Sequence, residues 1–191
     1  MSINLQKGGS INLTKSAPTT TVFKIGLGWD ASNGGQTMDL DASAFMLNAN
    51  GKFHDPLHFV FYNNLHSPEA APAIQHSGDN LTGAAEGDDE TITVTVPNIP
   101  PEIAEISFII SIYDAVAKGQ HFGMVKNAFA RIYDAGTGKE LAKFNLTDEC
   151  NGATSVQMGS LMRRAGDTWS FEAVGVGSAA GLQDYINQYQ E

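Results

Sequence analysis

Residues 22–29 read Val22-Phe23-Lys24-Ile25-Gly26-Leu27-Gly28-Trp29. Large apolar side chains stand at every second position, namely Phe23, Ile25, Leu27 and Trp29. Because successive side chains of a strand point to opposite faces, this period of two predicts a half-buried β-strand. The stretch sets the pattern for the rest of the chain.

The same signature recurs at residues 42–47, 57–62, 91–96, 106–113, 129–133, 141–146 and 169–174. Turn-forming clusters of Gly, Pro, Asn and Asp separate these stretches. Residues 3–5 and 11–13 repeat Ile-Asn-Leu around a Gly-rich turn, which predicts a hairpin. Helical propensity is confined to 68–74, 122–128 and 179–190. We therefore expect an all-β fold, a two-sheet antiparallel β-sandwich with a few short helices.

The chain has 191 residues, which fits one large all-β domain, and no linker divides it, so we expect a single domain over residues 1–191. Its longest apolar run, about eight residues at 106–113, is far shorter than the roughly 20 that cross a bilayer. Polar Lys7 and two glycines stand where an export signal needs an apolar segment. Cys150 is the single cysteine, which excludes a disulfide framework within the chain. We expect a cytoplasmic protein without direct membrane insertion.

The net charge is −10, and acids are unevenly placed: residues 53–117 hold ten of them and no Lys or Arg. Binding a nucleic-acid backbone requires clustered Lys and Arg, so nucleic acid is excluded as a partner. Cations are the expected partners of such a chain.

The acids gather in two places, Asp39-Leu40-Asp41 and the segment from Asp79 to Glu90. Residues i and i+2 of an extended segment point to one side, so Asp39 and Asp41 can direct two carboxylates at one point. Calcium takes six to eight hard oxygen ligands. The predicted ligands are Asp39, Asp41, Asn63, Asp79, Asn80, Asp88, Asp89 and Glu90, and we expect more than one calcium ion.

Two carboxylates about 5 Å apart repel by roughly 3 kcal/mol at an effective dielectric of about 20, which argues that a cation fills the site. The alternative is a solvated acidic loop that serves solubility. Asn63 and Asp114 follow apolar strands, where they contribute to a metal site or simply form turns.

Three other patterns do not carry a function. The segment from Asp79 to Glu90 has EF-hand length, but Leu81, Gly83 and Ala84 stand where an EF-hand needs oxygen ligands and a glycine. Residues 26–31 match the dinucleotide pattern G-x-G-x-x-A but continue as a loop, so no helix N-terminus is present to hold a pyrophosphate. The five histidines show no zinc-site spacing, and we expect them on the surface.

The motifs at these acids resemble the TerD family of tellurium-resistance and bacterial stress proteins. The matching stretches are GLGWD (26–30), DLDASAF (39–45), FYNN (61–64), HSGDNLTG (76–83) and GDDE (87–90). The segments at 5–9 and 169–175 fit too, so the resemblance covers nearly the whole chain. The family often shows Asp-Phe-Asp-Leu-Asp where this chain has Thr37-Met38-Asp39-Leu40-Asp41.

This resemblance implies a β-sandwich that binds calcium through its acidic loops and acts in resistance to tellurite and other stresses. It also implies other tellurite-resistance proteins as partners, with a membrane-bound partner as a further possibility, and no known reaction. Our leading hypothesis is a non-enzymatic, metal-dependent binding or scaffold module. The alternatives are a metal-dependent hydrolase that uses the same acidic cluster to activate water, and a passive calcium buffer.

Overall fold

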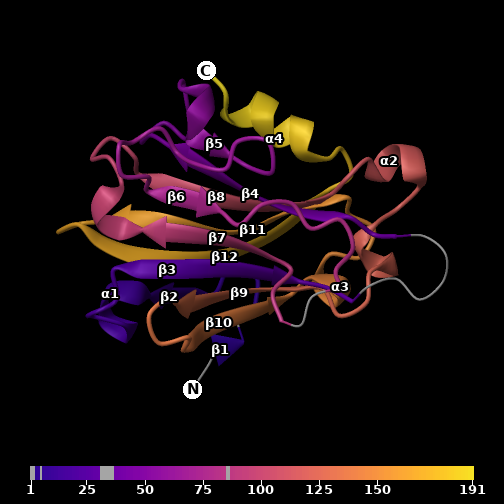
Figure 1. Ribbon diagram of the computed structural model, residues 1–191, viewed down its shortest axis with the longest axis horizontal. Helices are drawn as coiled ribbons and strands as arrows, with labels where there is room; N and C mark the ends of the chain where they lie inside the picture. The colour runs from indigo at the N-terminus through magenta and orange to yellow at the C-terminus, as the bar shows by residue number, and fades with distance from the viewer. Residues whose placement is uncertain (1–2, 5, 31–36, 85–86) are drawn as a thin grey trace.

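The structure is a computed structural model that describes residues 3–4, 6–30, 37–84 and 87–191. Its strands form two sheets of six (Figure 1), and every pairing is antiparallel except the one between the short first strand and β10. The all-β sandwich that the strand pattern predicts is confirmed. No helix in the described part of the chain is long and apolar enough to span a bilayer.

The two sheets are named sheet A and sheet B. Sheet A holds, in spatial order, β1 (Ile3–Asn4), β10 (Glu140–Asn145), β9 (Phe129–Asp134), β3 (Val22–Gly28), β7 (Glu90–Thr95) and β6 (Ile74–His76). Sheet B holds β2 (Ser10–Asn12), β12 (Thr168–Ser178), β11 (Ser155–Arg164), β8 (Glu105–Ile112), β4 (Leu40–Leu47) and β5 (Phe59–Val60).

The helices are short, and the last of them packs against the outer face of sheet B. They are α1 (Leu13–Ser16), α2 (Ala115–Lys118), α3 (Leu146–Glu149), α4 (Leu182–Tyr189) and the 3-10 turns η1 (Pro56–His58), η2 (Val96–Asn98) and η3 (Phe122–Met124). The α4 helix confirms the helix expected at 179–190. Of the helix expected at 122–128, only the 3-10 turn η3 is present. The stretch 68–74 is not helical, and its last residue opens β6.

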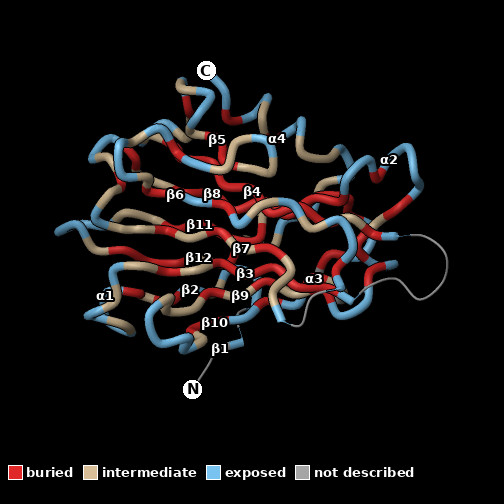
Figure 2. The backbone as a smooth tube through the Cα atoms, in the orientation of Figure 1, coloured by how far each residue is buried: buried red, intermediate tan, exposed pale blue. Residues whose placement is uncertain are grey.

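The main core lies between the sheets and follows the period of two. On β7, Ile92 and Val94 are buried, while Thr91, Thr93 and Thr95, which alternate with them, are half-exposed. On β4 every residue is buried (Figure 2), because the outer face of sheet B has its own cover. Phe45 stacks on Phe59 at 4.3 Å between ring centroids, and Tyr189 of α4 packs against Phe45 at 5.1 Å. Sheet B is therefore covered on both faces along β4.

The predicted hairpin of residues 3–5 and 11–13 is wrong. β1 pairs with β10 in sheet A, whereas β2 pairs with β12 in sheet B. The Gly-rich turn at 7–9 thus passes from one sheet to the other, with the Gly8 N–H and the Gly9 carbonyl both bonded to Ala173 of β12. The two strands share the pair Ile-Asn but join different sheets, because each finds its partner in a sheet and not in the other strand.

Candidate metal centre

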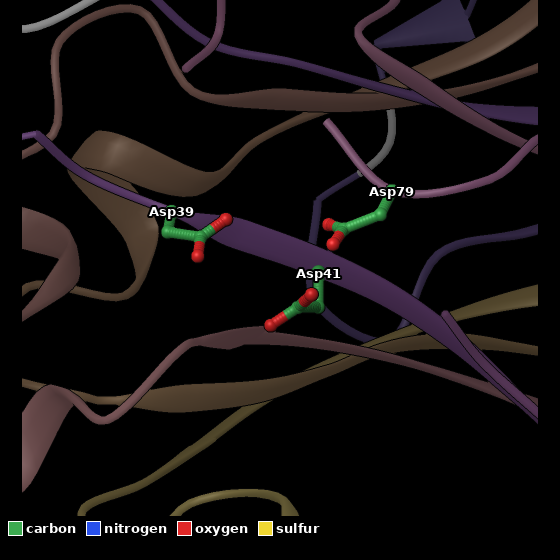
Figure 3. Close-up of side chains that lie close together, drawn as sticks. All are labelled: Asp39, Asp41 and Asp79. Carbon is green, nitrogen blue, oxygen red and sulfur yellow. The ribbon is translucent and has the colours of Figure 1, made fainter. Parts of the chain in front are cut away.

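Three carboxylates meet at the start of β4: Asp39 and Asp41 from the strand and its approach, and Asp79 from the loop after β6 (Figure 3). One oxygen of each lies within 4.8 Å of the others. Calcium holds its oxygen ligands at about 2.3–2.6 Å, so oxygens up to about 5 Å apart can contact the same ion. The spacing fits a single hard cation.

The alternation of β4 positions the first two carboxylates. Leu40 between them is fully buried in the main core, so its neighbours on either side point to the outer face of sheet B. Asp41 is only 4% exposed, Asp39 is half-buried and Asp79 is exposed. The cluster thus opens to solvent on the side of the Asp79 loop.

Two side chains of sheet A tie that sheet to the free edge of β4. Glu90, at the start of β7, accepts a hydrogen bond from the Ala42 N–H at 2.8 Å. The His76 Nε2 lies 3.0 Å from the Ala42 carbonyl oxygen. Both backbone groups of Ala42 face away from β8 just beyond the short pairing with β5, and these side chains satisfy them where no strand does. Asp41 is held in place by this clamp on the next residue.

The hydrogen bonds of His76 identify its proton. The Gly78 N–H donates to Nδ1 at 3.0 Å, so Nδ1 is an acceptor and the proton stands on Nε2, which donates to the Ala42 carbonyl. The contact of Nε2 with Glu90 at 3.4 Å therefore joins a neutral ring to a carboxylate and is not a pair of full charges. The side chain of His76 is completely buried, so the expectation of surface histidines is wrong at this position.

The loop that carries Asp79 is organised by Asn80. Its N–H donates to the second oxygen of Glu90 at 3.1 Å, and its side-chain oxygen accepts from the Thr82 and Gly83 N–H groups. Gly83 packs on the indole of Trp29, where an added Cβ would lie 2.2 Å from Nε1. The same Nε1 donates to the Met38 carbonyl at 3.1 Å. Trp29 thus supports both the Asp79 loop and the approach to Asp39.

The electrostatics show that the cluster lacks a full counter-charge. Burial first, and then the charge of Glu90, raise the pKa of Asp41 to about 8. Burial and the charge of Asp79 raise the pKa of Asp39, whose buried Oδ1 accepts no hydrogen bond from the described residues. Among the described residues, Lys118 of α2 is the one cation that lowers both pKa values. A divalent ion at this point would relieve both the repulsion and the unsatisfied oxygen.

The other predicted ligands lie elsewhere. Asp88 pairs with Arg131 of β9, at 2.8 Å from Oδ1 to Nε and 3.0 Å from Oδ2 to Nη2. Asp89 accepts from the Trp29 N–H at 3.0 Å. Asn63 is exposed in the two-residue turn closed by the backbone bonds between Phe61 and Asn64, the turn role that we left open for it. Of the eight predicted ligands, the structure brings together Asp39, Asp41 and Asp79, with Glu90 and Asn80 directly behind them.

Sequence reasoning missed three residues that build the site: His76, Trp29 and Tyr62. Tyr62 lies close enough to the acids that burial and the charge of Asp41 raise its pKa. A signal was present for His76, since it opens the HSGDNLTG motif three residues before Asp79. Nothing in the local sequence connects Trp29 to the Asp79 loop, because the contact spans more than fifty residues.

A family model described as the TerD domain matches residues 1–189. The chain is 43% identical over 190 residues to a protein of Alcaligenes sp named "Tellurium resistance protein TerD", covering 99% of this chain and 97% of the relative. It is also 43% identical over 191 residues to "General stress protein 16U" of Bacillus subtilis (strain 168), covering 99% of this chain and 97% of that protein.

A solved structure shares the fold. The crystal structure of a homologue of telluride resistance protein (TerD) from Streptomyces coelicolor A3(2) matches with a TM-score of 0.70 at 23% identity. The match covers 87% of this chain and 95% of that one. With the family model and the close relatives, these matches confirm what the motifs at 26–30, 39–45 and 76–83 indicate: the chain belongs to the TerD family of tellurium-resistance and stress-response proteins.

Proposed function

We propose that this protein is a calcium-dependent, non-enzymatic binding module of the tellurium-resistance and stress-response type. The observation that carries the proposal is the set of three carboxylates within 4.8 Å, one of them almost fully buried, with no Lys or Arg paired to it in the described residues. Hard oxygens in this number and spacing suit calcium, and magnesium less, because magnesium requires a small octahedral shell.

Calcium would join two parts of the molecule that are far apart in sequence. Asp39 and Asp41 belong to sheet B, while Asp79 belongs to an exposed loop that leaves sheet A. Without the ion, carboxylate repulsion favours separation of that loop from β4. With the ion, the loop is held against the strand and the surface at this end of the sandwich becomes ordered. An ordered surface of this kind can dock partner proteins, and other tellurite-resistance proteins are the proposed partners.

Calorimetric titration of metal-stripped protein tests the metal assignment. The parent should bind calcium with an affinity well above that for magnesium. Replacing both Asp39→Asn and Asp41→Asn should weaken calcium binding by at least about 100-fold, which is about 2.8 kcal/mol, because affinity follows the ligand charge count. The matched control is Glu102→Gln, which removes one exposed carboxylate at the far end of β8 and should leave the affinity unchanged. Equal affinity of parent and double variant would remove these residues from the ligand set.

A pull-down with calcium or with chelator, run beside a hydrolase panel on the same preparation, tests the role. Capture of partners from a lysate should depend on calcium, and the protein should turn over no phosphate ester, nucleotide or peptide. Metal-dependent turnover that the double variant abolishes would favour the hydrolase. Identical capture in both buffers would favour a passive buffer.

A further inference from the structure

A pocket of about 260 Å³ opens beside the metal cluster, and Asp41 lines it. Besides Asp41, its walls come from four places: the end of β8 with the turn into α2, Tyr62, Thr154 just before β11, and the segment 180–183 that leads into α4. Figure 1 shows α2 and the start of α4 at this same end of the sandwich. We call this hollow the α2 pocket.

The chemistry of its walls is acidic and aromatic. Asp41 and Asp114 supply carboxylates, and the rings of Tyr62 and Tyr113 meet edge to face with 6.3 Å between centroids. No Lys, Arg or His is among the described residues that line it. Asp41 is 4% exposed, and only burial and other charges, without any hydrogen bond, perturb it. A cavity with carboxylates, aromatic faces and no basic group selects a cation.

The protein itself shows what kind of cation suits this place. The ammonium of Lys118 lies 4.9 Å from the centre of the Tyr113 ring and donates to the Tyr113 carbonyl at 3.0 Å. Lys118 is not among the described residues that line the pocket, whereas Tyr113 is. Where the Tyr113 ring borders the pocket, an ammonium or guanidinium group from outside can contact it.

A bound calcium ion would not reverse the sign of the site. Asp39, Asp41, Asp79 and Asp114 carry four negative charges against two from one calcium ion and one from Lys118, so the site stays negative. The rim of the pocket also exposes two large apolar side chains, Tyr113 at 49% and Val116 at 70%. An apolar rim around a charged pocket matches a protein surface better than a free amine, because the rim residues then become buried too.

We propose that the α2 pocket receives a lysine or arginine side chain presented by a partner protein. The inference rests on the proposed function, since it names the contact through which the calcium-ordered surface docks its partner. Asp114 and the Asp41 carboxylate attract the charged head, and the tyrosine rings pack along the aliphatic stem.

The test follows backbone amide signals by NMR while the calcium-loaded full chain is titrated with the peptide acetyl-Gly-Lys-Gly-amide. The uncharged analogue with norleucine in place of lysine serves as the matched probe. The lysine peptide should shift the amides of Tyr113, Val116 and Gly181, and the norleucine peptide should not. Asp114→Asn should weaken lysine-peptide binding by at least about tenfold, with calcium affinity by calorimetry unchanged. Asn is tolerated at the left-handed backbone of Asp114, where φ is 54°, so the variant should fold.

Asp167→Asn is the control variant, because Asp167 is also an aspartate with a left-handed backbone, φ 56°, but lies in the turn between β11 and β12 at the other end of sheet B. It should bind the lysine peptide like the parent. Tyr113→Leu, which keeps an apolar side chain but removes the ring, provides a second variant and should also weaken binding. Equal shifts with both peptides, or shifts spread over the acidic surface and insensitive to Asp114→Asn, would overturn the inference. Absence of calcium binding in the parent would instead overturn the proposed function.

Discussion

The acids around Asp41 and the acids around Asp88 look alike in sequence, but their surroundings differ. The first cluster meets at the edge of sheet B, where the pKa values of Asp39 and Asp41 are raised and Lys118 lowers them only in part. The second is closed: Arg131 holds Asp88 through two hydrogen bonds and also reaches Glu140 at 3.4 Å. The first cluster has no paired Lys or Arg among the described residues, and the second already has its cation.

A glycine makes the closed cluster possible. Asp88 precedes β7 and Arg131 lies on β9, with β3 between them. Asp88 crosses β3 above Gly26, where an added Cβ would lie 2.3 Å from its carboxylate. The missing side chain of Gly26 thus leaves space for the ion pair. This explains the glycine at position 26, which matches the dinucleotide pattern only by chance. The comparison shows that a lack of nearby Lys and Arg in the sequence says little about pairing across strands.

The largest expected effect concerns the pH dependence of the open cluster. The pKa of Asp41 is about 8 in the folded chain against an ordinary value of 3.8, so between these values the folded state binds more protons than the unfolded state. The free energy of unfolding of the metal-free protein should therefore fall as the pH rises from 5 to 8, by at most about 4 kcal/mol. Denaturant unfolding at a series of pH values measures this.

Calcium should remove that slope, because the bound ion keeps the carboxylates ionised in the folded state. Asp41→Asn should also remove most of it without metal, since the group with the large pKa shift is gone and Asp39 remains. Hydrogen bonds from Thr20 and His54 lower the pKa values of Asp134 and Glu191. These two groups therefore change the free energy of unfolding only at more acidic pH, below the range from 5 to 8. A metal-free protein that gains stability between pH 5 and 8 would contradict the picture of an uncompensated cluster.

The closed cluster should lose stability when its cation is removed. Arg131→Met leaves Asp88, whose side chain is 6% exposed, without a counter-charge, while Arg131 itself is 30% exposed. We expect a loss of about 2 kcal/mol in the free energy of unfolding, below the range for fully buried pairs because water reaches the arginine. Urea unfolding measures it, and adding Asp88→Asn to Arg131→Met should restore part of the loss. A single-variant loss below about 0.5 kcal/mol would show that the pair is only a surface contact.

The sheet class of the fold could be predicted from the sequence, but one central strand could not. β11 reads Ser155-Val-Gln-Met-Gly-Ser-Leu-Met-Arg-Arg, with polar residues and Gly159 breaking the alternation. The glycine is required because a Cβ there would lie 2.6 Å from both the Phe171 ring and the Glu172 carbonyl, beside a register shift with β12. In the sequence alone such a glycine suggests a turn, although in the structure it leaves space for a neighbouring aromatic ring.

The metal site could be predicted only in part, because some of its geometry is local and some depends on residues far apart in the sequence. The spacing of Asp39 and Asp41 is local geometry, so their common direction follows from the strand period. That Asp79 joins them depends on how the edges of two sheets meet. The sequence pointed to Asp79 as one acid of the segment from Asp79 to Glu90 and could not separate it from the others. Asp88 differs from Asp79 in being paired with a cation, Arg131, which lies 43 positions later in the chain. Such long-range pairing leaves no trace in a window of the sequence.

The smallest expected effect is the sharpest test of the comparison. Asp88→Asn removes one negative charge from the same acidic segment as Asp79→Asn, yet the two should differ in calcium binding. Asp79 offers an oxygen within 4.8 Å of those of Asp39 and Asp41, whereas both oxygens of Asp88 are engaged by Arg131. In calorimetry, Asp88→Asn should change the calcium dissociation constant by less than about threefold, under about 0.7 kcal/mol, and Asp79→Asn by at least about tenfold. Comparable losses in both variants would mean that overall charge, and not the geometry at the start of β4, sets the affinity. In that case the ion would be drawn to the acidic segment as a whole, and the distinction between an open and a closed cluster would fail.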